Sequence, residues 1–418
     1  MTATATTATA TTTSATKVQQ DKPAGENHFG LDSPRAQVLL EAARNMGPVL
    51  EARQEACNSD RRIPDDTIAD FHAAGFFKML QSSEYGGYEM DPQVFYAVLL
   101  EIAKTCMSSA WALGVIGVHN WQMNLFDDPA AQEVWGKDST VLISSSYAPV
   151  GQVTPVEGGF MLKGRWSFSS GCEHCDWVFL GAVVPTAEEP WNMLNYRTFL
   201  LPKKDYKIVD NWDVVGLRGT GSHDIVVNDV FVPEHRTHNM LADDGGRKFM
   251  HKPPLYRLPF MQVFSRAVST PTLGALEGAL EKYVSVAKTR LAGAIMMHDD
   301  PNAKRLAAEV DAAIASMKGT LFQNFDHLMA CARAGEVTKE LDRARFRFNT
   351  AVVADQCVAL SSRMLKSAGS SGIRHGSALL KQHHDILASQ AHIANIADPF
   401  AINLGGMLFG QASIDPSV

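Results

Sequence analysis

The chain has no surplus of positive charge and no long uninterrupted apolar run. Its 418 residues carry 38 lysines and arginines against 45 aspartates and glutamates, giving a formal net charge of −7. That balance argues against nucleic acid as a partner and leaves no basic patch for a membrane surface. No segment approaches the roughly 20 consecutive apolar residues of a membrane-spanning helix. We therefore expect a cytoplasmic protein of two or three domains, because the chain is too long for one ordinary core.

Cysteine is scarce, and its spacing offers no metal or disulfide framework. Only one CxxC pair is present among the six cysteines, formed by Cys172 and Cys175 with Glu173 and His174 between them. A zinc site would need a second pair at similar spacing. The other four cysteines are scattered among helical patterns, where a small buried thiol is usual. We expect no bound metal.

A nicotinamide-binding fingerprint is also missing. Gly216, Gly219 and Gly221 have the wrong spacing for a Rossmann turn, and the pattern that follows them is that of a strand and not of a helix. Any redox chemistry would therefore need a reductant that is supplied from elsewhere.

The sequence divides into blocks with different apolar periods. Residues 1–26 begin with a run of threonine and alanine and are predicted to be a disordered tail. Residues 27–138 show helical spacing, residues 139–245 alternate with period two, and residues 246–418 return to helical stripes. The middle block suits an antiparallel β domain and the last block an antiparallel helix bundle. The predicted fold class is α+β, with a β domain between two helical domains.

The most informative stretch is residues 164–171, GRWSFSSG, where an alternating strand runs into two hydroxyls and a glycine. Buried hydroxyls at a strand end are costly unless the backbone or a polar ligand takes up their hydrogen bonds. Residues 144–151 are predicted to end a second strand in the same style, and residues 216–222 lead into a third. We interpret the ligand as the edge of a flavin ring.

In order and spacing, these segments resemble the middle domain of the acyl-CoA dehydrogenase superfamily. More closely, the chain is similar to the reduced-flavin-dependent two-component monooxygenases built on that fold, of the 4-hydroxyphenylacetate 3-hydroxylase type, from about Arg35 to its C-terminus. The resemblance implies reduced FMN or FADH2, supplied by a separate NAD(P)H:flavin reductase, with O2 as cosubstrate. The implied reaction is hydroxylation of a small phenolic or aminoaromatic substrate through a C4a-hydroperoxyflavin.

The resemblance also assigns roles to the hydroxyls and to one histidine. Ser170, beside Ser169, would lie against the flavin N5 and C4a edge and accept the hydrogen bond of the N5 proton. On the residues alone, a serine bonded to its own backbone is an equal alternative. His119, which shares one side of a predicted helix with Trp111, would accept the phenol proton of the substrate together with Ser145. The alternative for His119 is a satisfied core histidine.

Further site residues come from the C-terminal block. His392 matches a histidine near flavin C4a in the relatives, where it would protonate the peroxide or keep it protonated. Arg257 would offset charge on reduced flavin or on an acidic substrate, unless it is merely an exposed arginine. The expected substrate pocket comprises Trp111, His119, Ser145, Tyr147, Phe260 and Ala394, although core packing explains the aromatic rings equally well.

Ala394 is a departure from the relatives, which carry an active-site tyrosine two residues after the histidine. Losing that ring and hydroxyl should open the pocket and remove one polar contact. We therefore expect a substrate other than 4-hydroxyphenylacetate, bulkier or less polar. Nothing in the sequence selects between FMN and FAD.

A second group, Arg290 with Ser370, Ser371 and Gly372, would hold the flavin phosphate. A guanidinium gives forked donors, and such a turn gives backbone N–H groups. In this superfamily these groups commonly come from a neighbouring subunit, so the resemblance implies an oligomer, usually a homotetramer. A surface arginine and an ordinary turn are the alternative.

Other functions on the same scaffold have specific requirements. An acyl-CoA dehydrogenase needs a carboxylate base, often a few residues past an Arg-Asp motif near the C-terminus. Here His384-Asp385 stands in that place, and residues 386–397 contain no Asp or Glu. We interpret the run His383 to Asp385 as a surface or interface feature. Oxygenation of nitrogen or sulfur stays open, and a non-catalytic flavin carrier would need the hydroxyls and histidines to be coincidences. We predict an oxygenase.

Overall fold

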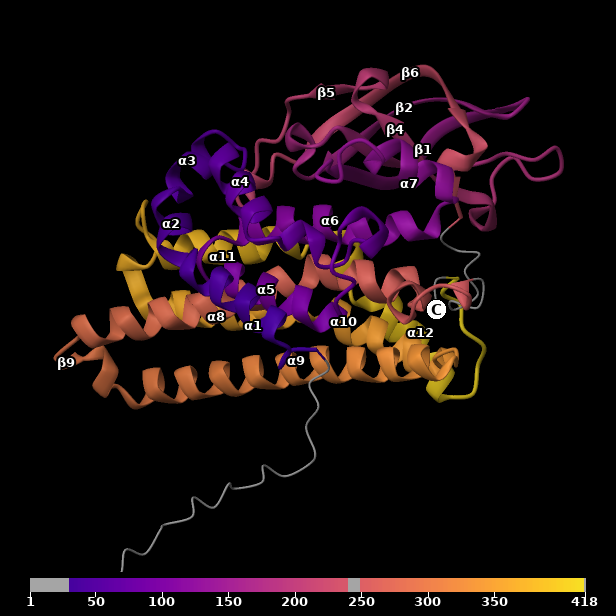
Figure 1. The fold of residues 1–418 in the computed structure, drawn as a ribbon. Coiled ribbons are helices and arrows are strands. Elements are labelled where there is room, and N and C mark those ends of the chain that lie inside the picture. The colour runs from indigo at the N-terminus through magenta and orange to yellow at the C-terminus, as the bar shows by residue number, and fades with distance from the viewer. Residues whose placement is uncertain (1–29, 240–248, 417–418) are drawn as a thin grey trace, which may run out of the picture.

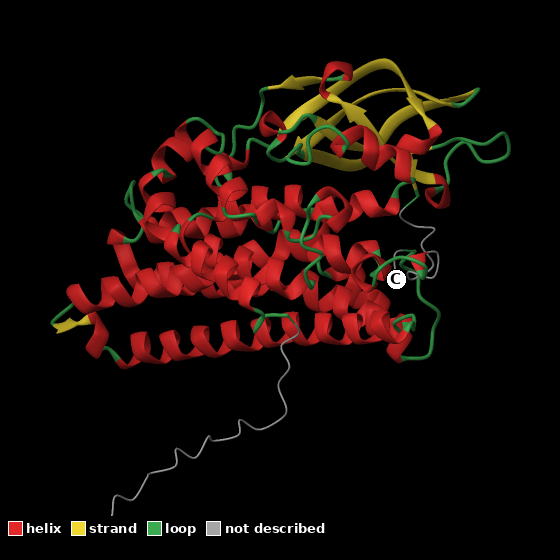
Figure 2. Ribbon diagram, viewed as in Figure 1, coloured by secondary structure: helices red, strands yellow, loops and turns green. Residues whose placement is uncertain are grey.

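The computed structural model describes residues 30–239 and 249–416, so the predicted tail at residues 1–26 lies outside the described part. Figure 1 shows a sheet lying against one side of a larger helical body, and Figure 2 shows the same division by secondary structure. The predicted α+β class, with a β domain between two helical parts, is confirmed. The boundaries at residues 138 and 245 stay predictions. No described helix is both long and apolar enough to cross a membrane.

The N-terminal helices surround one central, wholly buried helix, α6. Every residue of α6 is buried, because this helix packs against β1 on one side and α8 on another. A helix that is apolar all round is expected in such a position. The elements of this part are α1 (Pro34–Asn45), α2 (Gly47–Ala52), α3 (Gln54–Ser59), α4 (Asp65–Ala73), α5 (Pro92–Thr105), α6 (Met107–Gln122) and α7 (Asp128–Trp135).

The C-terminal part is a bundle of long helices, as the apolar stripes predict. Pro301 at its first position and the capping side chain of Asp300 begin the longest helix, and Gly335 in a left-handed conformation ends it. The helices are α8 (Phe260–Thr289), α9 (Pro301–Ala334), α10 (Glu340–Ala368), α11 (Ala378–Ser389) and α12 (Asp398–Leu408), and the short strands β8 (Leu291–Ala292) and β9 (Ile295–Met296) join α8 to α9.

The sheet has seven strands in the order β5-β6-β2-β1-β3-β4-β7. It is mixed, so the prediction of a purely antiparallel domain was wrong for one pair: β1 and β3 run parallel. Only residues 170–176 link β2 to β3, so β3 must start at the end of the sheet where β2 stops. The strands are β1 (Ile143–Val156), β2 (Gly159–Ser169), β3 (Trp177–Val183), β4 (Tyr196–Pro202), β5 (Lys207–Val209), β6 (His223–Pro233) and β7 (Thr237–His238).

The hydroxyl-rich segments meet at one end of this sheet. Ser145 lies near the start of β1 and not at a strand end, so that prediction was wrong for residues 144–151. Because β1 and β2 are antiparallel, however, the start of β1 lies beside the end of β2, where Ser170 follows. The Ser146 hydroxyl donates to the Ser167 carbonyl at 2.7 Å and fastens the two strands together there.

Helices α6 and α8 pack closely against each other at Gly114. A Cβ atom added to Gly114 would lie 2.7 Å from the carbonyl oxygen of Ala267. Such a contact with backbone cannot be relieved by a side-chain rotation, so the crossing requires glycine.

We predict that Gly114→Ala destabilises the protein by about 1–3 kcal/mol, because α6 and α8 must move apart. Gly319→Ala in α9 is the matched control, since nothing lies within 4 Å of an added Cβ there. The control should be neutral or stabilising by up to about 1 kcal/mol through helix propensity. Chemical denaturation measures both, and equal stability of the two variants would contradict the close crossing.

Candidate active site

Ser170 is bonded to distant side chains and not to its own backbone. Its hydroxyl accepts a hydrogen bond from Nε1 of Trp111 at 3.2 Å and lies 2.7 Å from the hydroxyl of Ser222. The next residue, Gly171, donates its N–H to the carbonyl of Thr220 at 2.7 Å. This serine therefore joins three elements: the end of β2, helix α6 and the loop before β6.

Ring contacts connect this serine to the other candidate residues. The edge of Trp111 meets His392, with ring centroids 5.6 Å apart. Phe264 on α8 lies 6.4 Å from His392 and 4.9 Å from Tyr147. Tyr147 in turn lies 6.1 Å from His119. Side chains from the sheet, α6, α8 and the turn η14 (Ile393–Asn395) thus form one continuous group, which we call the aromatic cluster.

His119 is a neutral hydrogen-bond acceptor. It is fully buried, and its Nδ1 lies 2.6 Å from the carbonyl oxygen of Ile143. Because a carbonyl only accepts, Nδ1 must carry the proton, and Nε2 keeps its lone pair. Nε2 has no hydrogen-bond partner among the described residues. Burial lowers the pKa of His119 to about 4, so the ring is neutral at pH 7 and can accept a proton from a ligand.

His392 has the opposite tautomer. Its Nδ1 accepts a hydrogen bond from the N–H of Ala394 at 3.1 Å, so the neutral ring carries its proton on Nε2 and can donate. Burial and the nearby Arg347 guanidinium lower the pKa of His392 to about 4. Arg347 also donates to the carbonyl of Ala394 at 3.0 Å and so holds the turn in place. The cluster therefore contains one imidazole acceptor, His119, and one imidazole donor.

Tyr147 is held by a chain of polar side chains. Its hydroxyl donates to Oε1 of Gln122, whose Nε2 lies 3.2 Å from Nε2 of His238. Burial raises the pKa of the Tyr147 phenol well above its ordinary value, although hydrogen bonds with Ser145 and Gln122 oppose that rise. Ser145 is therefore part of the group through Tyr147. Phe260 joins it as well, 5.7 Å from the Tyr147 ring.

Arg257 is used differently from the other candidates. Its Nε donates to the carbonyl of Lys252 at 2.6 Å, and its Nη1 donates to the carbonyl of Ala332 at 2.9 Å. The guanidinium thus fastens the segment before α8 to the last turn of α9. Neither of these hydrogen bonds reaches the aromatic cluster, so the predicted role of Arg257 at the flavin stays a prediction.

Arg290 and the Ser370-Gly372 turn lie together, in a second group at the β8–β9 end of the bundle, far from the sheet (Figure 1). The backbone of Gly369 has φ +61°, and an added Cβ there would lie 2.9 Å from Nη2 of Arg290. Nη1 of Arg290 is buried without a hydrogen-bond partner among the described residues. An unsatisfied guanidinium beside a glycine turn suits an anion, which the protein would take from a ligand.

Family models match both helical parts of the chain. Residues 35–135 match the N-terminal domain of acyl-CoA dehydrogenases, and residues 267–396 match their C-terminal domain. The chain is also 36% identical over 384 residues to a flavin-dependent monooxygenase, oxygenase subunit HsaA, from Rhodococcus jostii (strain RHA1). That match covers 89% of this chain and 98% of the relative.

The chain belongs to the flavin-dependent monooxygenase oxygenase subunits.

Other comparisons agree with this family. The p-hydroxyphenylacetate 3-hydroxylase oxygenase component of Acinetobacter baumannii is 28% identical, over 91% of this chain and 90% of the relative. The crystal structure of 3-HSA hydroxylase from Rhodococcus sp. RHA1 superposes with a TM-score of 0.86 at 34% identity, covering 93% of this chain and 100% of that one. The fold is that of the acyl-CoA dehydrogenases, and the cofactor is a reduced flavin used with O2.

The described residues fit a flavin at the end of β2. The hydroxyl of Ser170, the donor Nε2 of His392 and the unpartnered acceptor Nε2 of His119 are hydrogen-bonding groups within the cluster. Phe168 offers a ring: it is 69% exposed, and its backbone has φ +71°, which is rare for a bulky residue. Ser169 is fully buried, and its hydroxyl has no partner among the described residues, so its role toward the flavin stays a prediction.

Several contributors to the site escaped the sequence analysis. Gln122 and Arg347 were missed because their partners are distant in the chain, although Gln122 stands one turn after His119 on the same buried helix. The run His383 to Asp385 was predicted to be a surface or interface feature, and the surface interpretation was wrong for Asp385. It is buried, accepts the N–H of Leu217 at 2.6 Å and pairs with Lys381 at 3.1 Å.

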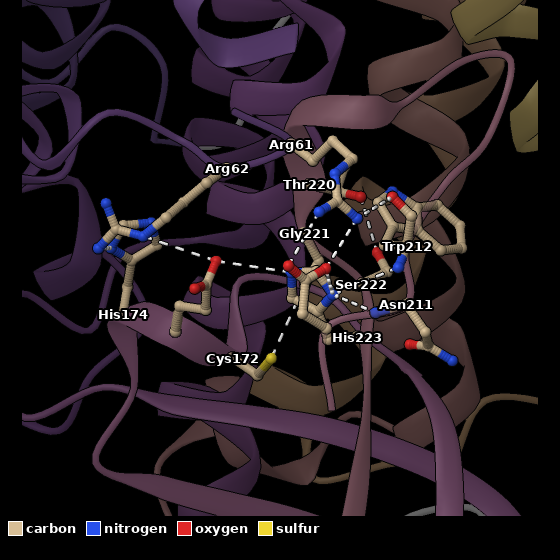
Figure 3. A network of polar contacts seen from close by, with 12 residues as sticks. Arg61, Arg62, Cys172, His174, Asn211, Trp212, Thr220, Gly221, Ser222 and His223 are labelled. Carbon is tan, nitrogen blue, oxygen red and sulfur yellow. Dashed lines mark hydrogen bonds and ion pairs between the residues drawn. The ribbon is translucent and has the colours of Figure 1, made fainter. Parts of the chain in front are cut away.

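A polar network fixes the loop before β6, which packs against Ser170. Figure 3 shows Arg61 and Arg62, from the link between α3 and α4, reaching the loop before β6 and the turn after β2. Arg61 donates to the carbonyl of Trp212 at 3.2 Å, and Arg62 lies 3.6 Å from Glu173. Glu173 in turn lies 3.6 Å from His223 at the start of β6. These contacts hold the two segments that carry the hydroxyls against the helical body.

We predict that the protein loses stability as the pH falls from 6.5 toward 4. Unfolded His119 takes up a proton near its ordinary pKa of 6.5, whereas the folded protein resists protonation until about pH 4. The stability is therefore fully present above pH 6.5, and up to about 3 kcal/mol is lost on the way down. His119→Asn should remove the His119 share of that slope in urea titrations at several pH values, whereas His392 and His174, whose pKa values burial also lowers to about 4, keep their own contributions.

The exposed His251 provides the matched control for this titration. His251→Asn should leave the pH dependence of the free energy of unfolding as it is in the unmutated protein. The assignment of a neutral, buried His119 would be wrong if both variants kept the full slope.

Proposed function

We propose that this oxygenase subunit hydroxylates an aromatic ring that carries a hydroxyl or amino group, at the aromatic cluster beside Ser170. The observation that supports this most is the pair of neutral imidazoles with opposite tautomers, an acceptor at His119 and a donor at His392. Reduced flavin, when bound, would activate O2, and one oxygen atom of that O2 would be transferred to the ring. The side chains of the cluster would bind, orient and exchange protons around it.

His119 would take the proton of the substrate. A phenol that donates to Nε2 gains electron density in its ring, which favours attack on an electrophilic oxygen. The bond from Nδ1 to the Ile143 carbonyl fixes this tautomer and stabilises the imidazolium that forms. Ser145 and Tyr147 would close the same side of the pocket.

Ser170 and His392 would serve the flavin. Ser170 would face the flavin N5 and C4a edge, as the family resemblance implies, and the Nε1–H of Trp111 occupies one acceptor position of its hydroxyl. His392 would present its Nε2 proton toward the oxygen that is bound there. Because its pKa is held near 4, His392 donates a hydrogen bond without carrying a charge. The role of Arg257 at the flavin stays a prediction, since its hydrogen bonds go to main-chain carbonyls.

The substrate is proposed to be bulkier or less polar than 4-hydroxyphenylacetate. Ala394 is buried two residues after His392, and its side chain is much smaller than the tyrosine that the relatives of that type would carry there. The walls nearby are apolar rings from α6 and α8, among them Trp111 and Phe264. HsaA and 3-HSA hydroxylase are more similar in sequence to this chain than the p-hydroxyphenylacetate enzyme is, which supports a substrate other than 4-hydroxyphenylacetate.

A separate component must supply the reduced flavin, as the relatives' designation as oxygenase subunits or components implies. We propose a flavin reductase and a homotetramer, in which Arg290 and the Ser370-Gly372 turn contact the flavin phosphate from a neighbouring subunit. The exposed apolar residues of α12 and its surroundings support association: Ile402, Leu408 and Phe409 are 66%, 61% and 88% exposed. Use of FMN or FAD and a cytoplasmic location stay predictions.

Thioester dehydrogenation fits the aromatic cluster less well. The described members of the cluster offer two neutral imidazoles and hydroxyls but no carboxylate to act as the base. Asp385 is already bonded to Leu217 and Lys381. Transfer of oxygen to nitrogen or sulfur remains the alternative chemistry at the same cluster.

The test is a single turnover with chemically reduced FMN or FADH2, ¹⁸O2 and a panel of phenols and anilines. We expect one ¹⁸O atom in a ring-hydroxylated product, with bulky phenols ahead of 4-hydroxyphenylacetate. His119→Asn should lower the rate of hydroxylation by at least about 100-fold, because a general base contributes that much or more. Binding of reduced flavin should be unchanged in this variant.

His251→Asn again gives the control, and it should retain full turnover. Reduction of the oxidised flavin by an acyl-CoA thioester, with no ¹⁸O product from any aromatic, would contradict the proposed function. Product on a thioether or an amine nitrogen, in place of ring carbon, would redirect it to the alternative chemistry.

A further inference from the structure

The hydroxyl of Ser170 belongs to a row of buried oxygens that ends on a main-chain carbonyl. Its Oγ lies 2.7 Å from Oγ of Ser222, which lies 2.7 Å from Oγ1 of Thr220. Oγ1 of Thr220 lies 2.8 Å from the carbonyl oxygen of Leu217. Figure 3 shows Thr220 and Ser222 on the turn that leads into β6. All three hydroxyl-bearing side chains are buried.

The number of protons fixes the direction of this row. Each of the three oxygen–oxygen pairs is short enough that one proton must lie between the two atoms. The three hydroxyls supply three protons, and the carbonyl supplies none. Thr220 therefore donates to Leu217, Ser222 donates to Thr220, and Ser170 donates to Ser222. The row has no other arrangement that satisfies all three contacts.

The count of protons also gives the remaining hydrogen-bonding capacity of the Ser170 hydroxyl. A hydroxyl has one proton and two acceptor positions. The proton of Ser170 goes to Ser222, and one acceptor position takes the N–H of Trp111, which can only donate. One acceptor position is left. Ser170 can thus accept one further hydrogen bond from a ligand but has no proton to give.

The Leu217 carbonyl, on which the row ends, cannot rotate away from Thr220. Leu217 has φ +55°, a left-handed conformation that a leucine seldom adopts, and its N–H is held by Asp385 at 2.6 Å. Its carbonyl also accepts from the N–H of Thr220 at 3.1 Å and from Nε1 of Trp212 at 3.0 Å. The acceptor end of the row is therefore fixed by α11 and by its own turn.

We propose that this row selects reduced flavin over oxidised flavin by making Ser170 an obligatory acceptor toward N5. The inference rests on the proposed function, in which Ser170 faces N5. Reduced flavin carries a proton on N5 and donates it, whereas oxidised flavin has a lone pair there and needs a donor. Thr220 and Ser222 are positioning residues: neither touches the flavin, and both set the direction of the Ser170 proton.

The experiment compares the dissociation constants of reduced and oxidised FMN, the reduced form under anaerobic conditions, for the full-length protein and three variants. Thr220→Val removes the hydroxyl at constant shape, so Ser222 can donate to Ser170 and release its proton toward N5. The preference for reduced over oxidised FMN should fall by about tenfold, the worth of one hydrogen bond exchanged for another. Ser222→Ala should have the same effect, and Thr220→Ser should keep the original preference.

The two ways of failing can be told apart. If the unmutated protein binds neither reduced FMN nor reduced FAD, the proposed function fails. If it binds them and Thr220→Val and Ser222→Ala weaken both redox forms of FMN equally, the row is only structural and this inference fails. The potential of the bound FMN gives a second readout: a tenfold loss of preference lowers it by about 30 mV.

Discussion

Burial of polar side chains between α6 and the sheet is the constraint on which the candidate site depends. Groups removed from water must find partners, and the partners available there decide which atom of each side chain carries a proton. The Ile143 carbonyl makes Nε2 of His119 an acceptor, whereas the N–H of Ala394 makes Nε2 of His392 a donor. Main-chain groups of β1 and η14 thus determine which hydrogen-bond donor and acceptor are available to a flavin and an aromatic ring.

Close approach of the elements makes this pairing possible. α6 carries Trp111, His119 and Gln122 on a helix that is buried throughout, and Gly114 lets it lie directly on α8. The short link after β2 places Ser170 at the same end of the sheet as Ser145, which comes from the start of β1. Residues that are far apart in the chain therefore form one cluster.

The sequence was informative where a residue's role follows from its local pattern. The helical stripes and the period-two strands predicted the fold class, and the hydroxyl-glycine stretch ending at Gly171 brought attention to Ser170. His119 and His392 were singled out by the family resemblance. The parallel pairing of β1 with β3 could not be predicted, because alternation of apolar residues is the same in either direction. Asp385, Arg347 and the direction of the Ser170 proton also depend on partners tens of residues or more away.

The measurement that tests the account most directly is the absorbance of the protein–reduced flavin complex after rapid mixing with O2, in the absence of substrate. A buried site with Ser170 as acceptor and His392 as neutral donor predicts a long-lived species whose spectrum matches neither reduced nor oxidised flavin. Direct return to the oxidised spectrum, with one equivalent of hydrogen peroxide released and no such species, would contradict the roles assigned to both residues.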